Sequence, residues 1–160
     1  MPTATKIPLA SVTLSSAVSG LTFGSISQSY TDLILIVNAN AASGSTGSIG
    51  LQYNGDAGSN YSYTRLLGDG SSASSARGSS TSTTYIGDTG TDKAVFVVSI
   101  NSYSNTTTYK THISRSSSQY YVSSYVGLWR STSAITSLTV SPPSGANWAS
   151  GSTFNLYGIL

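Results

Sequence analysis

The sequence predicts an all-β protein, a single-domain two-sheet antiparallel β-sandwich of jelly-roll type. Three observations lead to this prediction. Short runs of Val, Ile, Thr, Tyr and Phe recur between Gly, Ser, Asn and Pro, at the spacing of about 8 to 12 residues that is typical of sandwiches. No apolar period of 3.6 residues persists, and Glu is absent, so a long helix is not expected. The 160 residues fit one domain, and 11 Tyr, 3 Phe and 2 Trp supply bulk for its core.

The expected strands are short and evenly spaced. In chain order they cover residues 7–14, 20–23, 32–38, 48–53, 61–67, 83–86, 93–100, 108–115, 120–129, 135–140 and 153–159. Residues 33–37 are apolar at every position, which predicts a central strand buried on both faces. The run 95–98 gives the same signal less strongly. In 108–115 and 135–140 apolar and polar residues alternate, as in strands with one buried face.

Turns and loops separate these strands. Asn54-Gly55 is the strongest hairpin signal, because both residue types tolerate positive φ. Pro142-Pro143 is expected to end the strand at 135–140. Residues 68–82, rich in Ser and Gly, predict a long exposed loop that is mobile unless a partner covers it. Residues 1–8 are expected to form an N-terminal arm, and residues 9–160 the sandwich domain.

Composition excludes several classes of partner. Charged residues make up 8% of the chain, its net charge is +2, and its Lys and Arg residues do not cluster, so nucleic acid is not an expected partner. No run approaches the roughly 20 apolar residues that span a bilayer, so no membrane partner is expected. The N-terminus lacks the charged and apolar regions of a signal peptide, which predicts a protein that is synthesised in the cytoplasm.

Few residues are suited to catalysis or metal binding. The single histidine, His112, lies on an alternating strand and is expected on its polar face as an ordinary surface residue rather than a general base. The five acidic residues are all Asp, and four of them stand in turn-like contexts. The oxygen-rich segment 54–60 suits calcium, but it lacks the closing Glu of an EF-hand loop. We therefore expect no enzyme activity, no cofactor and no metal.

Aromatic residues are the better candidates for binding. Tyr121, Tyr125 and Trp129 share one face of the strand at 120–129, and Val and Leu occupy the other. Taking the Val and Leu face as core leaves Tyr121 and Tyr125 exposed, where they could stack on a sugar or anchor a protein interface. The alternative is a strand covered on both faces. Trp129 is expected to pack inside, whereas Trp148 could cover the sandwich edge or meet a partner.

Several blocks of the sequence resemble small virion proteins of tailed phages, especially those of cyanobacteria and other aquatic bacteria. The blocks are SVTLSSAVSGLTFGSI with YTDLIL, QYNGDAGSNYSYT, LLGDGSSASS, GLWRSTSAITSLTV and STFNLYGI, and in order they extend from Ser11 to Ile159. The resemblance implies a structural component of the virion with no enzyme activity. It implies a capsid decoration (cement) protein on the capsid surface or, alternatively, a tail-fibre or neck domain that binds host surface polysaccharide.

The decoration reading implies two partners, the major capsid protein and further copies of this chain in a homotrimer that buries edge strands. The arm and the loop around Arg77 lack packing partners of their own, so they are expected contacts. The candidate contact residues, with the aromatic ones included, are Pro2, Thr3, Thr5, Lys6, Arg77, Tyr121, Tyr125 and Trp148.

Overall fold

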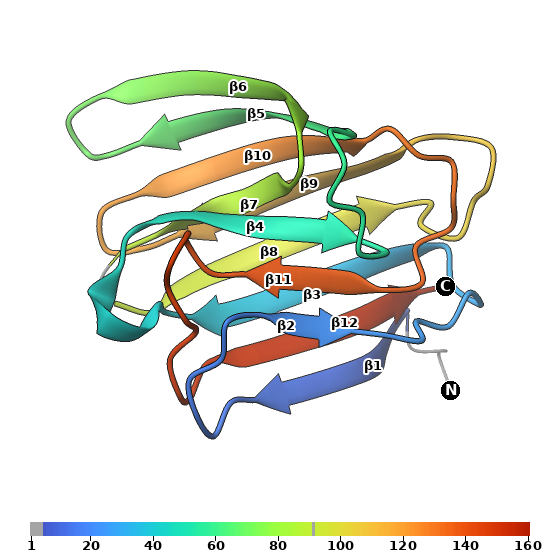
Figure 1. The fold of residues 1–160 in the computed structure, drawn as a ribbon, viewed down its shortest axis with the longest axis horizontal. Helices are drawn as coiled ribbons and strands as arrows, with labels where there is room; N and C mark the ends of the chain where they lie inside the picture. Colours follow the sequence, from blue (N-terminus) through green and yellow to red (C-terminus); the bar gives the residue numbers. More distant parts are fainter. Residues whose placement is uncertain (1–4, 91) are drawn as a thin grey trace.

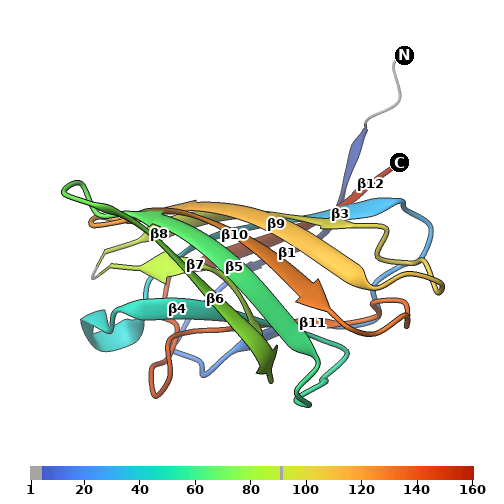
Figure 2. The same cartoon turned by 90° about the horizontal axis from the view of Figure 1, so that it is seen from above.

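The structure is a computed structural model that describes residues 5–90 and 92–160. These residues form two antiparallel sheets, one of eight strands and one of four. The two sheets pack against each other as a β-sandwich, which confirms the predicted fold class (Figures 1 and 2). Figure 2 shows the small sheet beneath one face of the large sheet, whose other face looks away from it.

The order of strands differs from their order in the chain. The large sheet has the order β1-β12-β3-β8-β9-β10-β5-β6 and the small sheet has the order β2-β11-β4-β7. Their bounds are β1 (Lys6–Thr13), β2 (Leu21–Phe23), β3 (Asp32–Ala39), β4 (Gly47–Tyr53), β5 (Tyr61–Gly68), β6 (Ala73–Thr81), β7 (Thr84–Thr89), β8 (Ala94–Asn101), β9 (Lys110–Ser117), β10 (Val122–Trp129), β11 (Leu138–Ser141) and β12 (Thr153–Ile159), with one short 3-10 helix, η1 (Ala42–Gly44).

Each predicted strand corresponds to an observed one, and their ends differ by three residues or fewer. The loop predicted at 68–82 is wrong for most of its length, because Ala73–Thr81 is strand β6, paired with β5. β6 lies at the edge of the large sheet and most of its residues are exposed. Such a strand needs no apolar side chains, so its Ser-rich sequence gave no strand signal.

The Asn54-Gly55 turn forms as predicted but does not make a hairpin. Both residues have positive φ, 52° and 68°, and the Asp56 amide donates to the Tyr53 carbonyl over 2.9 Å. However, β4 belongs to the small sheet and β5 to the large one. The turn is therefore a corner that carries the chain from one sheet to the other.

The N-terminal arm predicted for residues 1–8 is wrong from Lys6 onward. Lys6 and Pro8 belong to β1, where they pair with Ile159 and Tyr157 of β12. Pro8 is tolerated because β1 is an edge strand and its register shifts between Pro8 and Ala10. Residues 1–4 lie outside the described part of the chain.

The apolar core lies between the two sheets. From the large sheet it takes alternate residues of β3 and β8, and from the small sheet residues of β4 and β11. Leu138 and Val140 of β11 are fully buried, as the alternation in 135–140 predicts. Trp129 is buried too, which confirms its predicted packing role. In the described residues no helix is long and apolar enough to cross a membrane.

The outer face of the large sheet is uncovered. Residues 33–37 and 95–98 were expected to be buried on both faces, and this is wrong for their outer side chains. Ile34, Ile36 and Val97 are only half-buried and Val95 is 45% exposed. The reason is that the small sheet packs on one face of the large sheet, and no other described element covers the opposite face (Figure 2).

We predict that Gly127→Ala destabilises the fold by about 2 kcal/mol or more, because the strand interior around it is full. A Cβ at Gly127 of β10 would overlap the His112 ring and the Thr84 hydroxyl. Gly24→Ala is the matched control, since nothing lies within 4 Å of a Cβ there, and it should change stability by less than about 0.5 kcal/mol. Urea unfolding measures both, and equal costs for the two variants would contradict this packing.

Candidate functional site

A polar layer fills the half of the sandwich where β7 lies beneath β5, β9 and β10. Its centre is the buried carboxylate of Asp88 on β7. Asp88 accepts hydrogen bonds from the Tyr125 hydroxyl and the Ser48 hydroxyl, each at 2.7 Å, and lies 3.5 Å from the Arg65 guanidinium. Arg65 and Tyr125 belong to the large sheet and Asp88 and Ser48 to the small one, so the cluster ties the two sheets together.

Tyr125 is therefore not a surface residue. It is fully buried, and its burial raises the pKa of its hydroxyl to about 12. The predicted faces of β10 are inverted: Ser123, Tyr125 and Trp129 point inward, while Val122 and Val126 point outward. The inward side chains find hydrogen-bond partners: Ser123 bonds Ser116 of β9, Tyr125 reaches Asp88 across the sandwich and Trp129 reaches Asp56. Tyr121 lies just before β10 and is half-buried.

His112 is buried as well, so its prediction as a surface residue is wrong. Its Nε2 lies 3.1 Å from the Tyr85 carbonyl oxygen, which can only accept, so Nε2 carries the proton. Its Nδ1 accepts from the Tyr53 hydroxyl over 3.1 Å. Burial lowers the pKa of His112 from 6.5 to about 4, and the Tyr85 carbonyl opposes this only in part. With both nitrogens engaged, the ring has no free position for a substrate.

Lys110 is the first inward residue of β9. Its ammonium donates to the carbonyls of Thr108 and Thr132 at 2.7 and 3.1 Å, and burial lowers its pKa. The lysine thus joins two loops at one end of the sandwich.

Asp56 closes the corner between β4 and β5. Its carboxylate accepts from the Trp129 indole at 2.7 Å, the Asn60 amide at 2.9 Å and the Gly58 backbone at 2.8 Å. These bonds lower the pKa of Asp56, that of Trp129 most strongly. Because N–H groups surround the carboxylate, its oxygens face positive hydrogen atoms rather than a cation, which argues against the calcium alternative for segment 54–60.

Most polar groups of this layer are hydrogen-bonded within the fold, whereas Arg65 Nε and the Thr84 and Ser114 hydroxyls have no hydrogen-bond partner among the described residues. The two ring nitrogens of His112 are hydrogen-bonded to the Tyr53 hydroxyl and the Tyr85 carbonyl, and neither is hydrogen-bonded to the nearby Thr84 hydroxyl. Across residues 5–90 and 92–160 no three His, Asp, Glu or Cys side chains gather where a metal could bind.

The outer face of the large sheet is the more promising site, a surface for contact rather than for chemistry. Leu66 is 63% exposed, Val122 62%, Val126 52% and Ile113 50%. The strand register places them on neighbouring rows, with Ile113 directly opposite Val126 and Leu66 opposite Ser124. Exposed apolar side chains that adjoin one another in this way mark an interaction surface.

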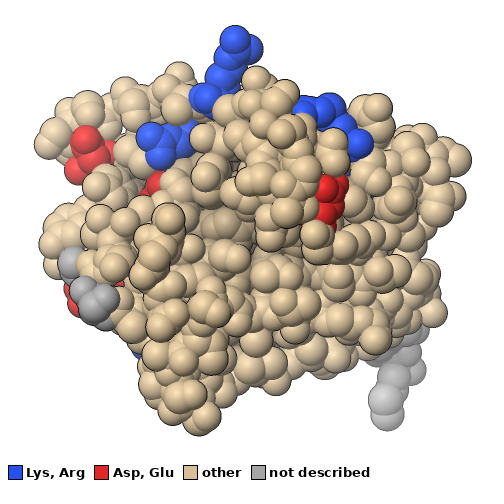
Figure 3. Space-filling view, viewed as in Figure 1, with Lys and Arg blue, Asp and Glu red and all other residues tan. Residues whose placement is uncertain are grey.

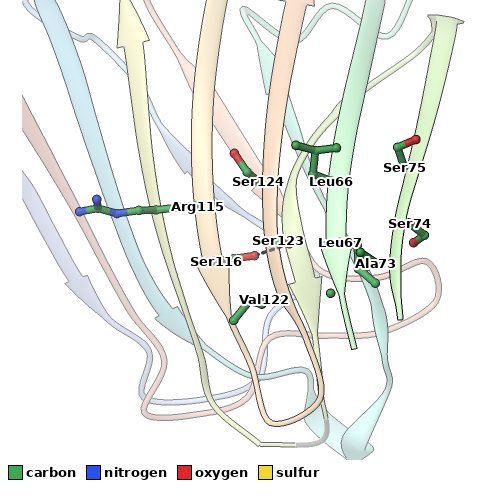
Figure 4. A pocket seen from close by; sticks show the side chains of 11 residues that line it. Leu66, Leu67, Ala73, Ser74, Ser75, Arg115, Ser116, Val122, Ser123 and Ser124 are labelled. Carbon is green, nitrogen blue, oxygen red and sulfur yellow. Dashed lines mark hydrogen bonds between the residues drawn. The ribbon is translucent and has the colours of Figure 1, made fainter. Parts of the chain in front are cut away.

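This outer face is hollowed on both sides of Arg115. One hollow, of about 460 Å³, is lined by Ile34, Ile36, Val97 and Ile113, together with Lys6 and Arg115 among others. The other, of about 680 Å³, lies over β5, β6 and β10 (Figure 4). Figure 4 shows Leu66 and Ser124 on neighbouring strands of this hollow, while the side chain of Arg115 reaches across the sheet away from them.

The opposite side of the sandwich has a different character. Figure 3 views the small-sheet face, where most side chains are uncharged and the charged ones gather towards the margin. Its hollow, of about 550 Å³, is lined mainly by Ser, Thr, Gly and Pro. It lacks the exposed apolar rows of the large sheet.

The predicted contact residues are not brought together at one place. Arg77 on β6 is exposed, and Thr5 and Lys6 are exposed at the start of β1. Pro2 and Thr3 lie outside the described residues. Trp148 is fully buried and donates to the Val140 carbonyl, so its prediction as a partner contact is wrong and it covers the core instead. The apolar rows of the outer face were missed, although the run 33–37 is apolar at every position.

No protein-family model, curated protein or solved structure matches this chain.

The burial of His112 predicts acid sensitivity. A histidine whose pKa is about 4 when folded and 6.5 when unfolded takes up a proton more readily on unfolding, so stability falls as the pH falls through this range. We expect a loss of about 3 kcal/mol between pH 7 and pH 4 in urea unfolding. The pKa values of Asp56 and Asp69 are lowered in the folded chain, so protonation of these two carboxylates changes the stability only below about pH 4. In His112→Gln this loss should vanish, and an unchanged slope would show that another group titrates.

The Asp88 cluster predicts that Tyr125→Phe costs about 1 to 3 kcal/mol of stability, because the carboxylate loses one of its two donors at 2.7 Å. Tyr121→Phe is the matched control on the same segment, since no hydrogen bond of its hydroxyl is seen among the described residues, and it should cost less than about 0.5 kcal/mol. Thermal unfolding compares them. If Tyr125→Phe is no more costly than the control, the hydroxyl does not support the carboxylate.

Proposed function

We propose that this chain is a non-enzymatic virion structural protein of a tailed phage, a capsid decoration (cement) protein that stabilises the capsid lattice. The observation that carries the proposal is the uncovered apolar face of the large sheet, because such a face suits a protein that works by contact. The side chains of His112, Asp88 and Asp56 form hydrogen bonds within the fold. This adds support, because few groups are then left for catalysis.

The sequence resemblance to small virion proteins supplies the phage setting of this proposal. A jelly-roll connectivity, which is frequent in viral capsid and lectin domains, belongs to the same proposal. So does a homotrimer, which would cover the free edge of β6.

The mechanism is binding alone. A protein that binds the mature lattice and not its disassembled subunits stabilises the lattice by mass action. Each copy needs a firm scaffold and a contact surface. The Asp88 cluster and the apolar core provide the scaffold, and the outer face provides the surface.

The alternative, a tail-fibre or neck domain that binds host polysaccharide, needs exposed aromatic rings. Tyr125 cannot serve because it is buried, but Tyr120 is 50% exposed and meets Tyr121 edge-on, with ring centres 6.3 Å apart. This pair between β9 and β10 is the place where a sugar could stack.

The copy number in purified particles separates the two proposals. Quantitative mass spectrometry against the major capsid protein should find this chain at a level comparable with the capsid protein itself. A level of a few copies per particle would contradict a decoration role and favour the appendage.

A further inference from the structure

Two arginines on the outer face of the large sheet have no counter-charge. In the described part of the chain the one ion pair is Arg65–Asp88, and neither Arg77 nor Arg115 has a hydrogen bond from its guanidinium to a described residue. Both side chains are exposed. A guanidinium in this state is ready to bind a carboxylate with two parallel hydrogen bonds.

The register of the strands gives the spacing of these charges. Arg77 lies opposite Thr64 of β5, which lies opposite Val126 of β10; Arg115 lies opposite Ser124 of β10. Arg77 and Arg115 are three strands apart across the sheet and two residues apart along the strands. At ordinary strand spacing their backbone positions are therefore about 16 Å apart. Leu66 and Val126 lie between them, so the surface is apolar with a cation on either side.

Carboxylates of this chain do not balance these cations. Asp32 lies at the margin of the face, in one hollow with Lys6, and accepts from the Ser102 backbone amide. Asp69 lies in the β5–β6 turn and accepts from the amides of Ser71 and Ser72. Neither forms an ion pair with Arg77 or Arg115.

The unpaired arginines favour one kind of partner on this face over a second copy of the chain or a nucleic acid. Two copies packed through it would bring four unpaired guanidinium groups into one interface, and burying like charges is costly. A nucleic acid would need more cations than the three on this face, Lys6, Arg77 and Arg115. An apolar protein surface with carboxylates complements both the exposed Val and Leu side chains and the arginines.

We propose that the outer face of the large sheet is the docking surface for a partner protein whose apolar contact patch carries two carboxylates, one placed to meet Arg77 and the other to meet Arg115. This inference rests on the proposed function in taking the capsid subunit as that partner. It explains why residues 33–37 have the pattern of a strand buried on both faces: the partner covers the second face.

The test uses capsids assembled without this protein, and measures binding of the purified full-length chain and its variants by co-sedimentation. Arg115→Glu should weaken binding about 100-fold, because it sets two carboxylates against each other. Val126→Ser should weaken it about tenfold through lost apolar contact. Lys93→Glu changes the net charge equally, and Lys93 lines neither hollow of this face, so this control should bind like the wild type.

The remaining outcomes overturn the inference in distinguishable ways. Wild type and all variants binding equally would retain the proposed function but exclude this face as its contact. A wild-type chain that does not bind capsids would remove both. A loss in Arg115→Glu without one in Val126→Ser would point to a purely anionic ligand. If the Arg115 and Val126 variants instead dissociate an oligomer of this chain in sedimentation, and capsid binding is unchanged, the face would be the contact with a second copy.

Discussion

The buried carboxylate of Asp88 determines which side chains of the large sheet point into the sandwich and which point outward. Arg65 of β5 and Tyr125 of β10 reach it from the large sheet, and Ser48 reaches it from β4. To do so β5 and β10 must turn these polar and aromatic side chains inward. By the alternation of a strand, their apolar neighbours Leu66 and Val126 then point outward. The exposed apolar face is thus a consequence of the polar interior.

This arrangement is informative about function because it reverses the usual distribution of side chains. A sandwich that acted alone in water would gain by placing Val and Leu inside and Ser and Lys outside. Here Lys110 and His112 are buried, whereas Ile113, next to His112 on the same strand, and Val126 opposite it are exposed. The proposed partner on the outer face would turn these exposed side chains into a second core, and the unpaired Arg115 would give that partner a charge to match.

The sequence was sufficient for the number and position of most strands, since β-branched runs and turn residues are local signals. It was insufficient where the decision depended on contacts across the sandwich. The alternation in β9 and β10 identified which residues share a face, but the choice of the inner face depends on Asp88, far away in the chain. β6 was missed because an exposed edge strand needs only backbone pairing. The corner at Asn54-Gly55 looks like a hairpin until the sheets are assigned.

The most direct test of this account is a cryo-EM reconstruction of the decorated particle, at a resolution that shows which side of the sandwich meets the lattice. The account predicts that the large sheet lies against the capsid subunit, with Val126 buried and a carboxylate of the subunit beside Arg115. A reconstruction in which the large sheet faces solvent, and the small sheet or the loops contact the capsid, would contradict it.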